Sequence, residues 1–367
     1  MDFSFDEQQL EFRAQLRSML ERECTAVDVR AAFDAASVFV PTPPTLARAE
    51  RESALSAEAL SASRDRWERL ASMGVVGLTV PESMGGLGLE MVDLVGLLEE
   101  AGFAGLPEPL AETVAMVVPL LIEAAQSEAV VEALISIAGG ESIATAGVAG
   151  AGTDEAVVPW GETADLVVVA SPERVVLAKA GELESTPVAS IDATRRQARV
   201  SATADLGLAI AQGPQASVSF ERLGRRAAVA ASADLIGASS RLIAFAREHA
   251  LQREQFGRPI GSFQAVKHLL ATAFVRVEMA RPVVYWAAAS IDSDVDSPQC
   301  GRDCALAKAA SSDAALDAAR VALQIHGAMG YTWEHDLHMW LKRVWVHSAS
   351  WGDSPMHLRS ILEYLTN

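Results

Sequence analysis

Two short segments place anion-binding groups at points where a helix is interrupted. Arg253 and Gln255 end an amphipathic helical run, and an exposed guanidinium there offers a planar fork of N–H donors that matches a pyrophosphate. Gly327 and Gly330 lie close together in segment 324–331, where glycines let backbone approach a ligand and backbone N–H groups can meet an anion. Both segments therefore favour the binding of an anionic group such as a pyrophosphate.

Simpler interpretations exist for individual residues of these segments. Arg253 can cap its own helix, and Phe256 can belong to the hydrophobic core. For His326, a hydrogen-bonded core position is as good an interpretation as a ligand contact. His335 and His338 are spaced for one helix face, but this spacing alone is weak evidence for a metal. We therefore predict no metal site.

Helical periodicity covers both segments and most of the remaining chain. The helical patterns span residues 5–21, 67–74, 91–102, 111–125, 127–138, 226–252, 263–291, 303–326, 337–348 and 356–365. Residues 75–80 are predicted to be extended, while residues 40–44, which are rich in proline, and the polar residues 292–298 are predicted to form loops. Residues 46–64 fit either a helix or a linker.

A change in composition marks a β region in the middle of the chain. Between Ser142 and Phe220 the chain becomes rich in Val, Thr and Gly, and the apolar runs 166–170 and 175–178 indicate strands. The order helical, β, helical predicts an α+β protein that is mostly α. The predicted domains are an N-terminal helical domain, a small middle β domain and a C-terminal helical bundle, at residues 1–139, 140–222 and 223–367.

Composition and charge exclude several classes of function. The 367 residues are 50% hydrophobic and 21% charged, and the net charge of −18 argues against binding to nucleic acid or anionic membranes. Cys24, Cys300 and Cys304 have no metal-ligand spacing and are expected to be reduced thiols. The acidic N-terminus is unlike a signal peptide, and the apolar runs 114–122 and 166–170 are too short to span a membrane. We expect a cytoplasmic protein.

The segments Arg253–Ile260 and Gln324–Tyr331 resemble the flavin-binding C-terminal half of the acyl-CoA dehydrogenases, and residues 67–89 are similar to the same family. The resemblance implies that family's fold: an N-terminal helical domain, a middle β domain and a C-terminal four-helix bundle. It also implies FAD as cofactor, with this chain reaching the flavin held mainly by a neighbouring subunit. The implied flavin contacts are Arg253, Gln255, Phe256, Gln264, Gln324, His326 and Gly327.

The same resemblance points to a missing catalytic base. Most relatives carry a Glu in a Tyr-Glu-Gly-Thr pattern between the last two helices, where this chain has Trp351 within residues 350–355. A second family position for the base falls on Ala227 or Ala228. Asp353 and Glu334 are alternative bases, although a helix-start acid and a solvated charge are their simpler interpretations. We predict no catalytic residue in this chain.

The middle region also lacks residues that are typical of the family. Relatives have a Thr-Glu-Pro-x-x-Gly-Ser-Asp stretch and a Trp-Ile-Thr/Ser strand that hold the isoalloxazine and the thioester. This chain has instead residues 145–150, Thr-Ala-Gly-Val-Ala-Gly, and residues 157–161, Val-Val-Pro-Trp-Gly. We therefore expect the chain to contact a neighbour's flavin and to hold one poorly itself.

The resemblance then implies the subunit that lacks a base in the heteromeric (α2β2) steroid-CoA dehydrogenases of actinobacteria, a type that segments 192–196 and 341–343 also resemble. Its implied partners are a homologous subunit with the catalytic Glu in a heterotetramer, an acyl-CoA substrate and an electron-transferring flavoprotein. Two alternatives stay open. One is a homomeric flavin oxidase or monooxygenase on the same fold, and the other is a scaffold subunit without catalysis.

Overall fold

The structure, a computed structural model, describes residues 5–36, 46–150, 152–161, 163–202 and 207–366, and the side chains of all these except 46–56 and 364–366. The loop predicted at residues 40–44 lies outside the described residues. The chain forms two compact units that interleave in sequence. The first comprises residues 1–30, 95–106 and 228–367, and the second comprises residues 31–94 and 107–227.

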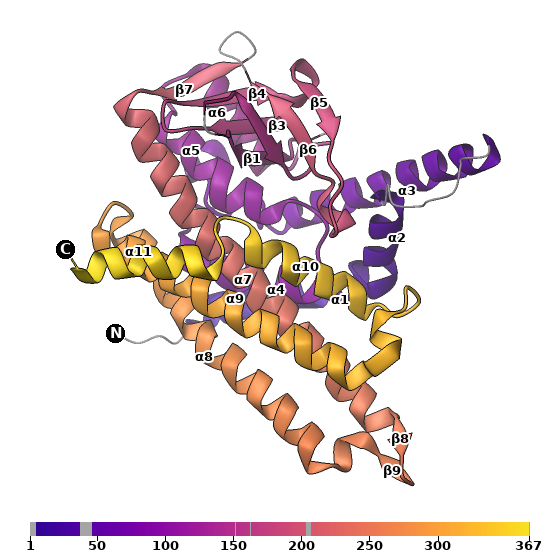
Figure 1. Ribbon diagram of the computed structural model, residues 1–367. Coiled ribbons are helices and arrows are strands. Elements are labelled where there is room, and N and C mark those ends of the chain that lie inside the picture. The colour runs from indigo at the N-terminus through magenta and orange to yellow at the C-terminus, as the bar shows by residue number, and fades with distance from the viewer. Residues whose placement is uncertain (1–4, 37–45, 151, 162, 203–206, 367) are drawn as a thin grey trace. The chain divides into compact units, whose positions relative to one another are not determined.

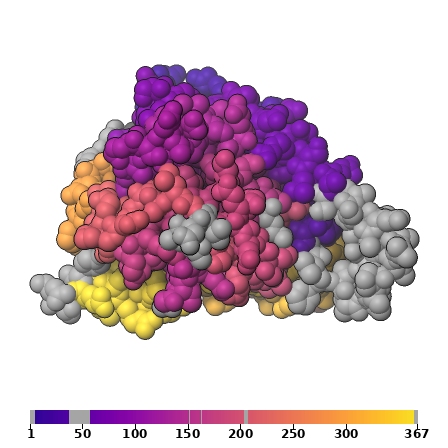
Figure 2. All heavy atoms as spheres, turned by 90° about the horizontal axis from the view of Figure 1, so that it is seen from above, coloured from indigo at the N-terminus to yellow at the C-terminus, as the bar shows by residue number. Residues whose placement is uncertain are grey.

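The second unit contains the strands predicted for the middle of the chain. One sheet has the order β1-β3-β4-β7 and the other the order β2-β6-β5. The strands are β1 (Ala144–Val148), β2 (Glu155–Val158), β3 (Leu166–Ala170), β4 (Arg174–Lys179), β5 (Glu184–Pro187), β6 (Ala198–Ser201) and β7 (Leu208–Gln212), with the 3-10 turns η3 (Ala180–Glu182) and η4 (Ala193–Arg195) between them. Figure 2 shows atoms of this strand region in magenta to rose.

A small apolar core lies between the two sheets. Val167 and Val169 of β3, Val176 of β4 and Val158 of β2 belong to it, together with Val200 of β6. Alternate residues of a strand point to one face, so the spacing of two between Val167 and Val169 places both side chains in this core. β1 pairs parallel with β3, and β3 pairs antiparallel with β4.

Helices complete the second unit. They are α3 (Leu46–Ser72), η1 (Glu82–Met84), the π-helical η2 (Ala111–Val117), α5 (Val118–Glu123) and α6 (Glu128–Ala138). α3 resolves the open interpretation of residues 46–64 in favour of a helix. The prediction that residues 75–80 are extended is wrong. The Val75 N–H donates to the Leu70 carbonyl at 2.9 Å, and the Val80 N–H donates to the Gly77 carbonyl at 3.2 Å, so the segment is a series of turns.

The first unit is built from helices. They are α1 (Glu7–Glu23), α8 (Gln264–Asp294), α9 (Pro298–His326), η6 (Gly327–Tyr331), α10 (Leu337–Ala349) and α11 (Ser354–Thr366), with β8 (Glu254–Gln255), β9 (Arg258–Pro259) and η5 (Ile260–Ser262) between α7 and α8. α2 (Ala26–Ala36), α4 (Met91–Ala104) and α7 (Pro214–Gln252) contribute residues to both units. Figure 1 shows the β8–β9 hairpin at one end of the long helices α7 and α8.

Glycines bring α4 and α7 into close contact within the first unit. A Cβ added at Gly102 would overlap the backbone of Asp234, and one added at Gly237 would overlap the backbone of Glu99. Only a residue without a side chain fits such a crossing. The same part of α4 carries Glu99 and Glu100, and Arg13 of α1 donates to both at 2.7 and 2.6 Å. These ion pairs bind α1 to α4.

The predicted helices of the C-terminal half are confirmed, with two corrections. α7 begins at Pro214 rather than at the predicted Arg226. The sequence did not predict this start because residues 214–222 alternate polar and apolar side chains and resemble a strand. The polar loop predicted at 292–298 is shorter, since α8 continues to Asp294 and α9 begins at Pro298 after the Ser297 side chain accepts the Cys300 N–H at 3.1 Å. The predicted fold class, α+β and mostly α, is confirmed.

Among the described residues, one helix, α7, is long and apolar enough to span a membrane by length and composition. Its most apolar window is 67% buried within the protein. That degree of burial is typical of a core helix, so the finding is weak evidence for a membrane span.

Candidate functional site

The first predicted segment folds into a β-hairpin between α7 and α8 (Figure 1). β8 and β9 pair antiparallel with Gln255 opposite Arg258, so Phe256 and Gly257 form the connection. Both residues of the connection have positive φ, 55° and 76°. That backbone is typical of the tight hairpin turns whose twist matches the paired strands.

The tip of the hairpin presents a bulky ring. The Phe256 side chain is 92% exposed, and its ring lies edge-on to that of Phe263 with 6.0 Å between centroids. The alternative that Phe256 belongs to the core is therefore wrong. A phenylalanine with positive φ is uncommon because its Cβ crowds the backbone. An exposed apolar ring held in this conformation favours a role in contact with another molecule.

Arg253 lies at the base of the hairpin with its side chain exposed. Its backbone N–H donates to the His249 carbonyl, and its carbonyl accepts the Ile260 N–H, both at 2.8 Å. Among the residues that the structure describes, its guanidinium has no hydrogen bond and no ion pair. Gln264, at the start of α8, is also exposed. Arg253 thus keeps its full set of side-chain donors for a group outside the described chain.

Gln255 is exposed as well, but its amide has a local partner. The side-chain Nε2 donates to the carbonyl of Glu254 at 2.7 Å. This bond fixes the amide against the hairpin and leaves its oxygen for other contacts. The structure thus presents the predicted residues Arg253, Gln255 and Phe256 together on one exposed hairpin.

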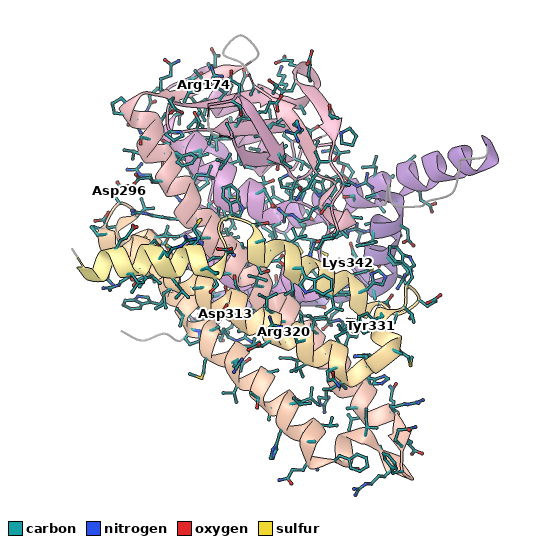
Figure 3. The ribbon with its side chains drawn as sticks, in the orientation of Figure 1. Arg174, Asp296, Asp313, Arg320, Tyr331 and Lys342 are labelled. Atoms are coloured by element: carbon teal, nitrogen blue, oxygen red, sulfur yellow. The ribbon has the colours of Figure 1, made fainter. Side chains whose placement is uncertain are left out.

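The second predicted segment forms the end of α9 and the turn η6. Gly327 ends the helix with φ 59° and ψ −136°, a conformation accessible essentially to glycine alone, and its N–H donates to the Leu323 carbonyl. A Cβ added at Gly327 would meet nothing within 4 Å, so the backbone there is open to approach. Gln324 is exposed one turn earlier, and Tyr331, labelled in Figure 3, is exposed at the end of η6.

His326 joins the two segments from the inside. It is 5% exposed, its Nδ1 donates to the Ala322 carbonyl at 2.8 Å, and its ring stacks on that of His249 with 4.5 Å between centroids. Because His249 lies one turn before Arg253, this stack brings the end of α7 against the end of α9. The pKa of His326 is lowered to about 4, mainly by burial and also by the neighbouring His249 and His335, while the bond to Ala322 opposes the shift. The imidazole is therefore neutral near pH 7.

His249 is a residue that sequence reasoning did not single out. Burial lowers its pKa, and His335 and the Arg253 guanidinium contribute in the same direction. It lies four residues before Arg253, a spacing of about one helical turn, and its carbonyl accepts the Arg253 N–H just past the end of α7. That spacing is the signal in the sequence, but only packing shows that the ring meets His326.

The predicted position of the missing base is a tight turn between α10 and α11. Trp351 and Gly352 both have positive φ, 59° and 93°. The His357 Nε2 donates to the Trp351 carbonyl at 2.9 Å. Asp353 begins α11, where its carboxylate accepts the Met356 N–H at 2.9 Å. The turn is therefore closed by α11 itself, and its one carboxylate caps that helix.

A buried lysine holds the same turn from α9. Lys308 is 0% exposed, and its ammonium donates at 3.0 Å to the Ser312 hydroxyl and to the carbonyls of Ser348 and Gly352. Burial lowers its pKa to about 8, and Asp353 opposes that shift. These bonds satisfy an ammonium in the interior. Sequence reasoning missed Lys308 because its partners lie about 40 residues away along the chain.

The other candidate positions for a base contain no suitable carboxylate. Ala227 and Ala228 are 0% and 2% exposed in α7. Glu334 is exposed beyond η6, where the structure gives it no hydrogen bond among the described residues. The capping bond of Asp353 and the exposure of Glu334 support their simpler interpretations, a helix cap and a solvated charge.

In the second unit, the groups that stand where the family motif is expected have structural partners. The Thr145 hydroxyl donates to the Pro159 carbonyl at 2.6 Å, and the indole N–H of Trp160 donates to the Pro107 carbonyl at 2.8 Å. Trp160 is 3% exposed and has φ 59°. Both donors are therefore used in building the unit. That this chain holds a flavin poorly stays a prediction.

The two segments that resemble the type of subunit without a base are also buried. Arg195 pairs with Glu112 at 2.7 Å inside the second unit, beside an Asp192 side chain that accepts from the Thr194 hydroxyl at 2.6 Å. In the first unit, Arg343 of α10 donates to the Leu106 carbonyl at 2.5 Å. These residues act as internal connectors in this chain.

Histidine and acidic side chains do not assemble a metal site in the part of the chain that the structure describes. His335 Nδ1 accepts the Leu337 N–H at 3.1 Å, and the His338 ring stacks on Trp333 with 4.6 Å between centroids. Burial lowers the pKa of His338 to about 4, the Lys342 and Arg30 charges add to the shift, and a bond to the Trp333 carbonyl and the Asp336 charge oppose it. Both histidines thus serve packing.

The geometry fits one part of a flavin dinucleotide and not another. The unpaired Arg253 guanidinium fits a pyrophosphate, whereas the backbone at Gly327, whose N–H is bonded to Leu323, offers room for a ligand and no free donor. In the second unit, the Thr145 hydroxyl and the Trp160 indole N–H are bonded within the chain and are not available to a ring system. The residue contacts to flavin remain predictions.

Comparisons with known proteins agree with this arrangement. Residues 218–366 match the family model for the C-terminal domain of acyl-CoA dehydrogenase, and residues 42–141 match that for the N-terminal domain. The acyl-CoA dehydrogenase IpdE2 of Mycobacterium tuberculosis is 34% identical over 298 residues, which cover 81% of this chain and 85% of IpdE2.

Two solved structures are similar in fold. The ChsE4-ChsE5 complex from Mycobacterium tuberculosis superposes with a TM-score of 0.81 and 22% identity, covering 100% of this chain and 99% of that chain. A variant of the Tcur3481-Tcur3483 steroid ACAD gives 0.77 and 20%, covering 98% of each chain. The sequence matches and the shared fold together show that the chain belongs to the acyl-CoA dehydrogenase family.

Proposed function

We propose that this chain is one subunit of a heteromeric FAD-dependent acyl-CoA dehydrogenase. In this proposal its hairpin contacts the flavin of a neighbouring subunit, and its Trp351 turn lacks the catalytic base. A homologous partner subunit carries the catalytic Glu and most of the flavin site. The observation that carries the proposal is the contrast between the unpaired Arg253 guanidinium and the Trp351 turn, whose carboxylate Asp353 is a helix cap.

Several exposed apolar side chains of the first unit support contact with another chain. They lie at the end of α7, on the hairpin and in the first half of α8, where they would cost free energy in water if left uncovered. They are Leu251, Phe256, Leu269, Phe274, Val275 and Met279, and the unit has further exposed apolar side chains on η6 and α11. A homologous subunit is the occupant we propose, in a heterotetramer like those that the sequence resemblance implies.

Within that complex, Arg253 and Gln255 would bind the pyrophosphate and adenosine part of FAD, and Gln324 would contact it from α9. A guanidinium fork gives a pyrophosphate paired, charge-assisted hydrogen bonds. When bound, FAD would supply the hydride acceptor for α,β-dehydrogenation of an acyl-CoA thioester. His326, neutral and buried, would keep the two segments together from behind.

Removal of the α proton requires a base within hydrogen-bond reach of the substrate carbon. This chain places Trp351, Ala227 and Ala228 at the family positions for that base. The proton acceptor must then come from the partner subunit. A steroid-CoA thioester is the substrate class we propose, because one of the similar structures is a steroid ACAD. We propose electron-transferring flavoprotein as the acceptor and the cytoplasm as the location.

Co-expression tests this function. The chain is purified alone and together with an acyl-CoA dehydrogenase homologue that carries the Glu and is encoded beside it. FAD content is measured by absorbance, and turnover by reduction of an artificial electron acceptor with a steroid-CoA substrate. We expect FAD and turnover only in the complex. An active, yellow protein from this chain by itself contradicts the proposal.

The remaining outcomes identify the alternatives. Stoichiometric FAD in a homotetramer, with oxygen consumption in the absence of an acceptor, would indicate a homomeric oxidase or monooxygenase. A complex that forms but keeps its full FAD when Arg253 is replaced by Ala would indicate a scaffold subunit.

A further inference from the structure

A cavity of about 180 Å³ lies within the first unit, where the end of α1 and the start of α2 meet α4 and α7. One part of its wall is apolar and is formed by Leu20, Cys24, Phe103 and Ala104. The rest is lined by Thr25 and Ala26 at the start of α2 and by the charged side chains of Arg17, Glu100, Arg241 and the exposed Glu21. None of these residues belongs to the hairpin or to the Trp351 turn described above.

The charges at the α1 side of the cavity compensate one another. Glu100 accepts from Arg13 at 2.6 Å, and it accepts twice from Arg17 at 2.8 and 2.6 Å. Both oxygens of that carboxylate are therefore occupied. Arg17 forms a paired contact with Glu100, so its guanidinium is largely neutralised.

Arg241 is different, because the structure gives it no carboxylate partner. Its Nε is buried without a hydrogen-bond partner, and among the described residues its guanidinium makes no ion pair. Aromatic rings surround it instead, with centroids 4.4 Å away for Phe245, 5.3 Å for Phe103 and 5.4 Å for Trp340. Ring faces stabilise a cation only partly.

The electrostatics of Arg241 point the same way. Burial lowers its pKa, and the carboxylates of Glu248 and Asp336 oppose the shift without contacting it. Asp336 is already paired with Arg30 at 2.6 Å. A half-buried cation without a counter-ion is costly. It becomes favourable when an anion enters beside it.

We propose that this cavity binds a short-chain monocarboxylate, with its carboxylate on the Arg241 guanidinium and its hydrocarbon body against Leu20 and Phe103. A single unpaired cation matches a single negative charge. The planar fork of a guanidinium matches a carboxylate in shape. The apolar wall would leave a phosphate dianion poorly solvated, whereas it buries a hydrocarbon chain.

The size of the cavity limits the ligand. A water molecule occupies about 30 Å³ in the liquid, so the cavity holds roughly six water-sized groups. Butyrate has a comparable number of non-hydrogen atoms, and a CoA thioester is far too large. The cavity therefore cannot enclose a whole acyl-CoA substrate.

Butyrate serves as the probe, with the full-length chain titrated by saturation-transfer NMR at constant ionic strength set with sodium chloride. We expect saturable millimolar binding to the wild-type chain. Arg241→Met, which keeps an apolar chain among the rings, is expected to weaken binding at least about tenfold. Arg247→Met removes an exposed arginine from the same helix and is the matched control, with binding expected to be unchanged.

A second measurement does not depend on any variant. Butyramide has the same shape as butyrate without its charge and is titrated against the wild-type chain, where we expect at least about tenfold weaker binding. Butyramide that binds as well as butyrate would overturn the proposal. So would butyrate binding that Arg241→Met leaves intact in a folded protein, or the absence of saturable butyrate binding to the wild type.

Discussion

The hairpin at residues 253–260 and the turn at residues 350–354 belong to the same compact unit but differ in how their polar groups are hydrogen-bonded and how far their side chains are exposed. The hairpin leaves the Arg253 guanidinium unpaired and the Phe256 ring almost fully exposed. At the turn, Lys308 of α9 donates to the Gly352 carbonyl, His357 of α11 donates to the Trp351 carbonyl, and the Asp353 carboxylate caps α11. The named groups of the hairpin are free, and those of the turn are bonded within the chain.

This difference teaches how function is divided in this chain. A surface that binds another molecule has free hydrogen-bond donors and exposed apolar groups, and in the isolated chain this exposure is unfavourable in free energy. A position that has lost its chemical role can be closed by internal hydrogen bonds, since nothing needs to enter. Under the proposed function, the hairpin is where the chain acts, and the turn is where a relative would act and this chain does not.

Loss of the lysine that closes the turn should have the largest effect. Lys308→Ala removes a fully buried side chain and leaves the carbonyls of Ser348 and Gly352 without their donor. We expect the free energy of unfolding to fall by roughly 3 kcal/mol. Urea denaturation followed by circular dichroism measures it. Lys308→Met keeps most of the volume and should lose less; an alanine variant as stable as the wild type would show that the turn is not closed by Lys308.

Lowering the pH should reduce the stability of the folded chain through His326, which packs beside the hairpin. The pKa of His326 is about 4 in the folded chain and about 6.5 when unfolded. As the pH falls from 6.5 to 4, the unfolded chain binds a proton that the folded chain does not. The free energy of unfolding should therefore fall, with this histidine contributing at most about 1.4 kcal/mol per pH unit.

His326→Gln tests that contribution in urea denaturation at several pH values. The variant should be less stable at pH 7 but should lose stability less steeply between pH 6.5 and 4. His268→Gln removes an exposed imidazole from α8 and controls for the loss of a histidine as such. A slope that is the same with and without His326 would mean that its ring takes up a proton in the folded chain as readily as in the unfolded chain.

A charged residue at the hairpin tip should weaken binding to the partner subunit without lowering the stability of the isolated chain. Phe256→Asp places a residue that tolerates positive φ on the exposed tip. We expect the isolated chain to keep its melting temperature, while the dissociation constant for the partner subunit rises at least about tenfold. Analytical ultracentrifugation of the two chains measures this constant. Ile135→Asp, on an exposed face of α6, is the control; equal behaviour of both variants would remove the hairpin from the interface.

The smallest effect is expected at the carboxylate of the turn. Asp353→Asn keeps an efficient helix cap and removes an ionisable group. In the active complex we expect kcat to stay within about twofold of wild type, whereas loss of a catalytic base lowers the rate by about 100-fold or more. Steady-state kinetics decide between these results. Glu334→Gln is tested in parallel, because a large loss in either variant would identify a base in this chain.

Local patterns in the sequence were enough to predict the main helices, the β region and the two exposed segments. The turns at Arg253 and Gly327 are determined by residues that are adjacent along the chain. Lys308, His249 and Arg241 could not be predicted, because their environments arise from helices that pack across long sequence separations. The start of α7 was missed for another reason: its first turns have the alternation of a strand, and packing overrides that preference.

The most direct test is the FAD content of the complex when Arg253 alone is changed. Arg253→Ala and the control Arg247→Ala, which removes an exposed arginine near the end of α7, are each co-purified with the homologous partner, and FAD per complex is measured after denaturation. We expect the control to keep its FAD and Arg253→Ala to lose most of it while both chains stay assembled. An assembled Arg253→Ala complex with undiminished FAD would contradict the proposal that this chain holds its neighbour's flavin.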